Sequence, residues 1–469
     1  MQRRMDGICP IALRPPDQRR MGGFNNKMRH MTLPAYGYRV KSMQNKTLIV
    51  GQPTASVQDN QYRLSATLKA QGGEAMPEHQ REIWLSLPVE YAEVFVNPES
   101  SDCFLMGLLY FAMRMGYSLK IEGKISAQLL WNLSNEAMPL ISAYRPLVQP
   151  VNIEAAETTD FPGGHFVGTG FSAGVDSFST IIGNLRHHVR PEDKLTHLFF
   201  FNVGANGQGR SLEEVEHVRK KFRMRYESFA PAAQLTGLPF IPIDSNVPSF
   251  MPNTFAAQLT LCNASAIYFL RKGLSKYLLS SEGYNCREWF RYLQLQPEEQ
   301  RFDMALLEPV LCQWLGDRNL QIIPYGNSMT RLEKTSLLAD YEPARQCLNV
   351  CNSEKAMEIN CSVCTKCRRT MLDLELLNKL DHFRKVFDVD LFRQKFKSRD
   401  YAEILYPPPE RENFFLHSSR RYAREQGIDI ASQCTQSDRF FAFMHQTWVY
   451  RVLKELHLLD FAKRLVGRG

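Results

Sequence analysis

Six consecutive residues, Ser172 to Ser177, have the types and spacing of a phosphate-binding turn. They stand between a short apolar run and an apolar run at helical spacing, which predicts a strand, a tight turn and a helix over 167–182. A helix N-terminus presents unpaired N–H groups and partial positive charge, so an anion in the turn is stabilised. Ala173, Gly174 and Val175 leave the backbone accessible, and the serines offer hydroxyl donors. An N-cap in an ordinary strand–helix unit is the alternative.

Four cysteines form a second constellation, Cys351, Cys361, Cys364 and Cys367, with the spacing C-x9-C-x2-C-x2-C. Four thiolates at these spacings can close a tetrahedral zinc site that leaves no open position for water. The site would then be structural and would tie its segment to the domain. Cys347 is an alternative first ligand. A redox C-x-x-C pair is the rival interpretation, but three cysteines in tandem favour a metal.

Polar residues follow the strand expected at Leu195–Val203 and the strand expected at Leu320–Tyr325. Asn202 could receive the nucleoside part of a nucleotide, or it could belong to a turn rich in Gly and Asn for conformational reasons alone. Arg331 and Lys334 begin a helix after the later strand. They could reach a triphosphate, and solvated helix charges are the alternative.

A loop with a carboxylate, a tyrosine and an arginine follows the strand expected at Lys276–Ser280. Glu282, Tyr284 and Arg287 are well placed there to hold a polar substrate, and Arg287 could fork onto a carboxylate. In the alternative interpretation Arg287 only pairs with a neighbouring glutamate on the surface.

The elements that must position these residues alternate between strand and helix over 163–381, which predicts an α/β fold with a doubly wound parallel sheet. Ligands of such sheets bind at the carboxyl ends of the strands, where the strand order reverses. The further elements expected here are helices at Leu212–Leu235 and Thr254–Leu270 and a strand at Phe240–Ile243.

Two other regions flank this domain. Over 47–157 we expect an α+β region whose alternating residues, Tyr62 to Leu68 and Ile83 to Leu87, form strands that pair antiparallel. It carries no catalytic signature. Over 382–469 we expect a mainly helical extension, with helices at Ser418–Gln426 and Arg439–Leu465, the second packing its apolar face on the chain's own core.

The chain has 469 residues and a formal net charge of +8, and residues 1–46, with ten Lys or Arg and two Asp, account for all of it. This leader is expected to be disordered. The neutral remainder speaks against a dedicated nucleic-acid binder. The longest apolar run, Cys103 to Met113, is far shorter than the ~20 residues that span a membrane. No signal peptide is evident, so we expect a cytoplasmic protein. The sequence leaves its oligomeric state open.

The turn and the cysteine motif together resemble the PP-loop ATP pyrophosphatases, whose loop reads Ser-Gly-Gly-x-Asp-Ser. Ala173 stands at the first glycine. Since alanine disfavours positive φ, the turn must run there with φ below zero for the match to hold. Within this superfamily, the pairing of a loop with a four-cysteine knuckle resembles the 7-cyano-7-deazaguanine synthase branch. Asn360, Arg368 and Arg369 around the cysteines match that branch, whereas the Ser and Tyr that flank its first cysteine are replaced by Val350 and Asn352.

The resemblance implies ATP-dependent activation of a carboxylate. The acid attacks the α-phosphate of ATP, pyrophosphate leaves into the loop, and an amine then takes the acyl group from the acyl-adenylate. Mg²⁺ supports pyrophosphate departure. The implied catalytic residues are Asp176, Ser177 and Lys334, with Asp176 organising the metal or the loop. In the synthase the acid is 7-carboxy-7-deazaguanine and the amine is ammonia.

The long flanking regions make the chain similar to synthase-like proteins of anti-phage defence clusters. We therefore expect a deazaguanine-type acid and an acceptor other than ammonia, such as a partner macromolecule. Two alternatives stay open. One is tRNA thiolation, which requires a persulfide-carrying cysteine near the loop, and the other is a nucleotide-binding scaffold without turnover, which Ala173 would permit.

Overall fold

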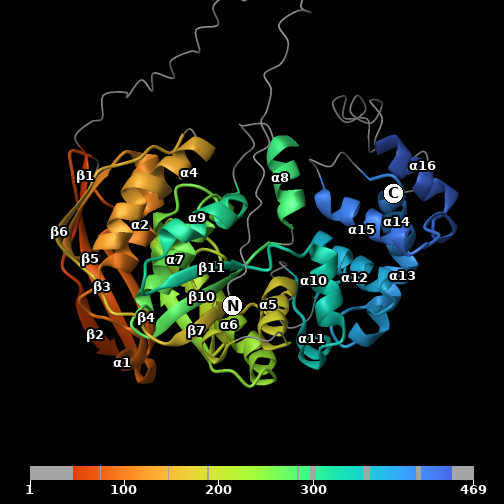
Figure 1. The fold of residues 1–469 in the computed structure, drawn as a ribbon, viewed down its shortest axis with the longest axis horizontal. Helices are drawn as coiled ribbons and strands as arrows, with labels where there is room; N and C mark the ends of the chain where they lie inside the picture. The colour runs from red at the N-terminus through yellow and green to blue at the C-terminus, as the bar shows by residue number, and fades with distance from the viewer. Residues whose placement is uncertain are drawn as a thin grey trace, which may run out of the picture. The chain divides into compact units, whose positions relative to one another are not determined.

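The structure is a computed structural model that describes residues 46–73, 75–145, 147–186, 190–282, 285–295, 303–351, 360–407 and 413–445. In this part of the chain, eleven strands form one mixed sheet in the order β11-β10-β7-β8-β9-β4-β3-β1-β5-β6, and β2 pairs with β3 (Figure 1). Helices pack against this sheet, so the predicted α/β class is confirmed.

The strands are β1 (Thr47–Val50), β2 (Thr54–Gln58), β3 (Gln61–Gln71), β4 (Glu82–Pro88), β5 (Ser118–Ser126), β6 (Ile153–Thr159), β7 (Phe166–Gly170), β8 (His197–Phe201), β9 (Phe240–Ser245), β10 (Leu274–Ser280) and β11 (Gln321–Tyr325). The α-helices are α1 (Ala92–Phe95), α2 (Asp102–Met115), α3 (Ala127–Asn132), α4 (Met138–Tyr144), α5 (Val175–Arg186), α6 (Leu212–Gln234), α7 (Leu259–Phe269), α8 (Cys286–Leu295), α9 (Glu308–Leu315), α10 (Arg331–Ala339), α11 (Glu342–Cys347), α12 (Thr365–Leu376), α13 (Val389–Lys395), α14 (Lys397–Leu405), α15 (Phe414–Glu425) and α16 (Gln436–His445).

The strands β11, β10, β7, β8 and β9 are mutually parallel. From β7 the chain builds outward through β8 to β9, and it then returns to the other side of β7 with β10 and β11. The carboxyl end of β7 therefore lies where the strand order reverses, which is where open α/β sheets bind their ligands. Each of these strands was predicted from its apolar run, to within a few residues.

The N-terminal strands continue the same sheet. The predicted antiparallel pairing of β3 with β4 is confirmed, with Leu64 opposite Leu85 and Ala66 opposite Ile83. A further antiparallel pairing, of β4 with β9, joins the strands of 47–157 to those of 163–381. This junction was not predicted from the sequence, and neither were the strands β1, β2 and β6.

Two hydrophobic clusters lie on opposite faces of the sheet. On β8, Leu198 and Phe200 belong to one cluster and Phe199 and Phe201 to the other, as the period-two alternation of a strand buried on both faces requires. The helices α2, α7 and α9 contribute to the cluster of Phe199 and Phe201. The helices α5, α10 and α12 contribute to the cluster of Leu198 and Phe200, which extends into the C-terminal helices.

The C-terminal extension is helical, as predicted. Its helix α15 contacts α10, α12 and α14, so the extension packs against α10 and α12 (Figure 1). The helix predicted from Ser418 begins earlier, at Phe414. The helix predicted at Arg439–Leu465 corresponds to α16, and its continuation from residue 446 lies outside the described residues, as do residues 1–45 of the leader. In the described part of the chain, every helix is too short or too polar to cross a bilayer.

Candidate functional site

The predicted phosphate turn connects β7 to α5. Ser172 is exposed, Gly174 is half-buried and Val175 begins the helix, so the turn lies at the helix N-terminus as expected. The expectation for Ala173 is wrong, because its φ is 53°, in the left-handed region. An L-residue there bears a strain of roughly 1–2 kcal/mol, which the surrounding structure must offset.

Contacts from two directions hold this turn. The Asn349 N–H donates to the carbonyl oxygen of Ala173, with 2.8 Å between nitrogen and oxygen. The Ser177 hydroxyl donates to the carbonyl oxygen of Gly174 at 3.0 Å, and the Ser177 side chain is buried. The turn is thus tied both to its own helix and to the segment that leads into the cysteine motif.

The strain at Ala173 leads to a test. Ala173→Gly removes about 1 kcal/mol of strain and loses a buried methyl group of similar value, about 0.8 kcal/mol, so the free energy of unfolding should stay nearly constant. The control is Ala344→Gly in α11, where the residue is equally buried but helical. It should cost roughly 2 kcal/mol in urea denaturation, since helix propensity and the methyl group are both lost. Equal losses in the two variants would contradict the strain.

The turn opens into a cleft with a volume of about 510 Å³. Ser172, Gly174, Val175 and Asp176 form one wall of this cleft. The other lining residues come from seven further segments and are Ala205, Lys221, Arg225, Phe229, Phe255, Ala256, Leu259, Glu282, Arg331, Asn349, Val350, Cys351, Lys366, Arg369 and Thr370. Five cations face two carboxylates, so the cleft has an excess of positive charge suited to a polyanion.

Asp176 is the centre of an ion-pair cluster at the mouth of α5. One of its oxygens lies 2.8 Å from Nη1 of Arg331, and the other lies 3.3 Å from Nζ of Lys334. Burial alone would raise the pKa of Asp176, but these two cations outweigh it and hold the pKa below its ordinary value. The carboxylate therefore stays ionised near neutral pH.

Arg331 and Lys334 occupy different depths. Arg331 lines the cleft, and its buried Nε has no hydrogen-bond acceptor among the described residues. Lys334 is 1% exposed and does not line the cleft; its ammonium also donates to the hydroxyl of Ser281 at 2.9 Å. Burial lowers the pKa of Lys334. The structure thus brings Arg331 to the ligand side and places Lys334 beneath Asp176, as a link between α10 and the end of β10.

Asn202 lies at the end of β8 but is fully buried and away from the cleft lining. Its amide donates to Asp244 at 2.8 Å, and its side-chain oxygen accepts from Asn206 at 3.4 Å. Asn206 in turn accepts from Nη1 of Arg225 at 3.1 Å. Asn202 therefore supports the position of Arg225 instead of contacting the cleft directly.

Four of the cleft cations were not predicted as ligands. Lys221 and Arg225 lie one turn apart on α6, and Lys366 and Arg369 lie in the first turns of α12. The spacing i, i+4 on α6 could have indicated a shared face, but only the fold shows which face meets the turn. Arg369 was noted only as a residue beside the cysteines, and both Lys366 and Arg369 line the cleft.

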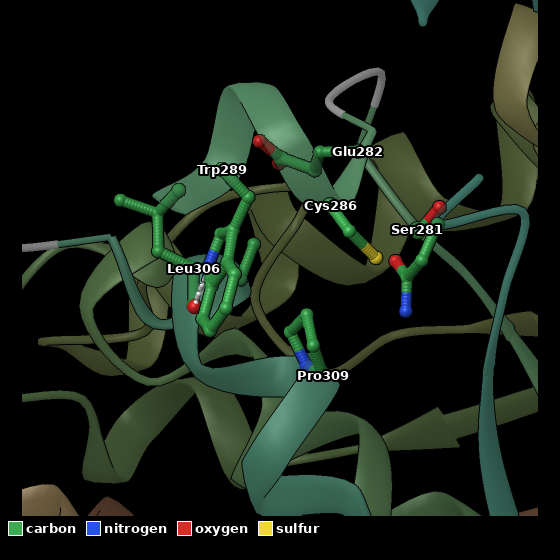
Figure 2. Close-up of a pocket in the computed structure, with 8 residues that line it drawn as sticks. Ser281, Glu282, Cys286, Trp289, Leu306 and Pro309 are labelled. Carbon is green, nitrogen blue, oxygen red and sulfur yellow. Dashed lines mark hydrogen bonds between the residues drawn. The ribbon is translucent and has the colours of Figure 1, made fainter. Parts of the chain in front are cut away.

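The three predicted substrate residues do not come together. Glu282 lines the cleft, Arg287 lines a separate groove, and Tyr284 lies outside the described residues. Glu282 also borders a cavity of about 20 Å³ with Ser281, Cys286 and Trp289 (Figure 2). Cys286 turns its sulfur toward the side of this cavity where Ser281 lies (Figure 2), and the residue as a whole is exposed.

Glu282 has a perturbed acidity. Burial within the site, together with the nearby carboxylates of Asp303 and Asp176, raises the pKa of Glu282 to about 7. Since the pKa in the unfolded chain is near the ordinary 4.5, the folded state holds the proton longer. Stability therefore declines as the pH rises from 4.5 to about 7 and is level above that. Glu282 as a whole is exposed, so screening by solvent reduces this pH-dependent change in stability.

The motif resemblance implies that the cleft binds ATP with Mg²⁺, and for this implied binding the acidity of Glu282 predicts a pH dependence. If the ionised form of Glu282 attracts the cation, affinity should rise several-fold between pH 6 and pH 8, and Glu282→Gln should remove this rise. The surface carboxylate of Glu403 provides the control, because Glu403→Gln should keep the wild-type profile. Calorimetric titration with ATP in the presence of Mg²⁺ measures both. An unchanged pH profile in Glu282→Gln would exclude this role.

The four predicted cysteines gather at one point, with all sulfur atoms within 4.8 Å of one another. The distances from Cys351 to Cys364 and from Cys361 to Cys367 are both 3.9 Å between sulfurs. A tetrahedron of thiolates around zinc, with Zn–S near 2.3 Å, has edges of about 3.8 Å. The donor set therefore fits zinc. Cys351 belongs to the cluster and Cys347 does not, which settles the choice of the first ligand.

Asn360 organises the loop around the cysteines. Its side-chain oxygen accepts from the Val350 N–H at 2.8 Å, and its amide donates to the carbonyl oxygens of Leu348 and Val386 at 2.8 and 3.0 Å. Burial would raise the pKa of Cys361, but the backbone N–H groups of Val363 and Cys364 outweigh it and lower the pKa to about 7. A thiol that ionises near neutral pH is ready to bind a metal.

The cysteine cluster and the cleft share structure. Cys351 itself lines the cleft, and Asn349, two residues earlier, holds the phosphate turn. On the other side of the cluster, α12 begins directly after Cys364 and carries Lys366 and Arg369 into the cleft. A metal bound by the cysteines would therefore fix two walls of the cleft at once.

No protein-family model, curated protein or solved structure matches this chain.

Proposed function

We propose that this protein binds ATP in the cleft beside the Ser172–Ser177 turn, uses it to activate a carboxylic acid as an acyl-adenylate, and transfers the acyl group to an amine. One observation carries the proposal above all others. The turn at the mouth of α5, which matches a pyrophosphate loop at five of its six positions, opens into a cleft that five cations and an apolar wall complete.

The triphosphate would lie against the turn. The N–H groups at the start of α5 point toward a bound anion, and Arg331 is oriented by Asp176 from the same side. Lys366 and Arg369 approach from α12, and Lys221 and Arg225 from α6. Preorganised donors of this kind stabilise the negative charge that develops when pyrophosphate departs.

The nucleoside would lie on the apolar part of the lining, which consists of Phe229, Phe255, Ala256 and Leu259. Aromatic and aliphatic side chains suit a purine ring. A deazaguanine-type acid, which the motif resemblance implies, is a flat heterocycle and could use the same kind of surface. Its carboxylate would have to reach the α-phosphate between the turn and Glu282.

Two carboxylates in the lining, Asp176 and Glu282, fit a divalent cation. Their mutual repulsion contributes to the raised pKa of Glu282, and a cation between them would relieve it. Mg²⁺ is usually held in this way, by one or two carboxylates together with substrate phosphates. When bound, it would supply neutralisation of the phosphate charge.

In the first step, a carboxylate oxygen of the acid forms a bond to the α-phosphorus, and the bond from that phosphorus to the bridging oxygen breaks. The electron pair leaves with pyrophosphate, whose charge Arg331, Lys366 and Arg369 offset. In the second step, the amine attacks the acyl carbon, AMP leaves, and the amine loses a proton. Once the cation has left with pyrophosphate, the carboxylate of Glu282, which borders the cleft and has a pKa of about 7 without the cation, can accept that proton.

Product analysis tests the proposal. The full chain is incubated with ATP, Mg²⁺ and candidate acids, deazaguanine acids among them, and the nucleotides are separated. We expect AMP and pyrophosphate only with a suitable acid, and at least tenfold less with Arg369→Ala, because one cleft cation is lost. Lys379→Ala, which removes an exposed cation paired with Asp340, should leave product formation unchanged. Release of ADP and phosphate instead would contradict adenylation.

A scaffold that binds ATP without turnover is the second candidate. The observation in its favour is that both oxygens of Asp176 are already engaged by Arg331 and Lys334. Tight ATP binding without AMP formation in the presence of every candidate acid would identify such a scaffold. The anti-phage role implied by the motif resemblance is compatible with either candidate.

A further inference from the structure

A second groove, separate from the cleft, lies between α8 and α15. Its volume is about 440 Å³, and the residues that line it are Arg287, Glu288, Arg291, Phe414, His417, Arg420, Arg421, Arg424 and Glu425. Five arginines against two glutamates leave a strong excess of positive charge. The neutral charge balance of the sequence outside the leader gave no sign of this, because the arginines come from two helices far apart in the chain.

The groove is held together by a buried carboxylate. Glu288 of α8 is 8% exposed and accepts from Nη2 of Arg421 at 2.8 Å and from the hydroxyl of Ser418, both on α15. The two helices are therefore fixed to each other. Since Glu288 is engaged by Arg421, the remaining arginines, Arg287 and Arg291 on α8 and Arg420 and Arg424 on α15, dominate the charge of the groove.

These four arginines form two rows. Arg287 and Arg291 lie one helical turn apart, as do Arg420 and Arg424, so each row repeats every ~6 Å along its helix. Guanidinium groups in such rows can fork onto successive anionic groups of a chain. The groove thus suits an extended polyanion better than a single small anion.

The groove is adjacent to the cleft. The loop that carries Glu282 into the cleft leads into α8, and α15 places the ring of Phe415 against two cleft cations. The guanidinium carbon of Arg369 lies 4.0 Å from the centre of that ring, and that of Arg331 lies 5.8 Å away. A polyanion held in the groove would therefore have part of its length near the reacting atoms.

From this arrangement we infer that the groove binds the phosphodiester backbone of a single-stranded nucleic acid, as the macromolecule that presents the acceptor amine. The binding itself stands on the groove alone, whereas its role as the acceptor site rests on the proposed function.

Two observations favour a nucleic acid over an acidic peptide. The walls are helices, whose backbone groups are already paired, so they offer no sheet edge to an extended peptide. In addition, Phe290 is 60% exposed on α8, one turn from Arg287 and next to Arg291. An exposed ring beside a row of arginines is the combination that binds single strands, through base stacking and phosphate pairing.

Fluorescence anisotropy tests the inference without ATP. The probes are a labelled 12-nucleotide RNA, the corresponding single-stranded DNA and a 12-residue peptide rich in Asp and Glu. We expect both nucleic acids to bind and the peptide not to bind; a tighter RNA or DNA complex identifies the natural strand. The full chain is used, and because its basic leader also attracts polyanions, the groove is judged from differences between variants.

The groove variant is Arg291→Ala with Arg424→Ala, two exposed residues from opposite walls. Affinity should fall at least tenfold, and the slope of log affinity against log salt should decrease by about 1.4, corresponding to two phosphate contacts. Phe290→Ala should lower affinity about tenfold without changing the slope. The charge-matched control is Arg384→Ala with Arg399→Ala, whose side chains are 48% and 51% exposed outside the groove, and it should bind like the wild type.

Equal losses in the groove and control variants, or binding of the peptide alone, would overturn the inference. Calorimetric titration with ATP separates this result from the proposed function. The groove variant should keep wild-type ATP affinity. If this variant loses nucleic-acid binding and still binds ATP, the loss is specific to the groove. Loss of ATP binding in the wild type would instead contradict the proposed function and leave the result for the groove standing.

Discussion

Replacement of Asp176 by alanine is expected to lower the free energy of unfolding by about 3 kcal/mol and to abolish ATP binding. Lys334 would then remain buried, 1% exposed, and its partners among the described residues would be the neutral oxygens of Ser281. Removing one member of a buried ion pair costs about 3–5 kcal/mol, because the other charge stays uncompensated. The Asp176 side chain is 27% exposed, so the lower end of that range applies. Urea denaturation measures the loss.

A double-mutant cycle separates this explanation from general damage to α5. Lys334→Met removes the stranded charge, so the variant with both substitutions should be more stable than Asp176→Ala alone. The matched control is Asp193→Ala, because Asp193 also bridges two cations and is about equally exposed, at 24%, but its partners Arg190 and Lys276 are 71% and 18% exposed and so stay in contact with water. Its effect should be much smaller. Additive losses in the cycle, or an equal loss at Asp193, would contradict the buried cluster.

On the proposal that the four-cysteine cluster holds zinc and the cleft binds ATP, replacement of Cys364 by serine is expected to abolish zinc binding and to weaken ATP binding at least tenfold. Structural zinc sites contribute roughly 10–16 kcal/mol of binding free energy in small peptides, so loss of a ligand unfolds the surrounding loop. Here that loop positions the N–H of Asn349 against the phosphate turn and the first turn of α12 against the cleft. Metal analysis of the purified protein and calorimetric titration with ATP measure the two effects.

Cys347→Ser is the control for this substitution. Cys347 lies four residues before Cys351 in the sequence but is not part of the four-sulfur cluster. It should therefore keep about one zinc per chain and wild-type ATP affinity. Loss of zinc from Cys347→Ser with retention in Cys364→Ser would show that the ligand set is wrong. Loss of zinc from Cys364→Ser with unchanged ATP affinity would show that the cluster does not support the cleft.

The elements around the phosphate turn were predictable because their signals are local. The apolar runs of β7, β8 and β10 and the helical spacing of α5 and α6 each lie within a short window, where periodicity is informative. The pairing of β4 with β9 was not predictable in this way. Their partners, such as Leu85 and Ser245, are far apart in the chain, and no local pattern records which strand lies beside which.

The site was predictable in part for the same reason. Ser172, Gly174, Val175 and Asp176 belong to one continuous motif and line the cleft, whereas Arg225 and Arg369 reach it from helices whose sequence patterns did not indicate a ligand site. Asn202 has the right position after a strand, but its side chain turns into a buried network, which only the packing around it decides. At Ala173 the turn requires a left-handed backbone conformation, and this requirement outweighs the preference of alanine for negative φ. Residue type alone therefore predicted the wrong sign of φ.

The most direct test of acyl-adenylate formation in this cleft is the exchange of labelled pyrophosphate into ATP. It needs the acid but no acceptor amine, since the first step is reversible on its own. We predict exchange that requires both a carboxylic acid and Mg²⁺ and that is lost in Asp176→Ala. Its absence with every acid, in wild-type protein that binds ATP, would contradict adenylation.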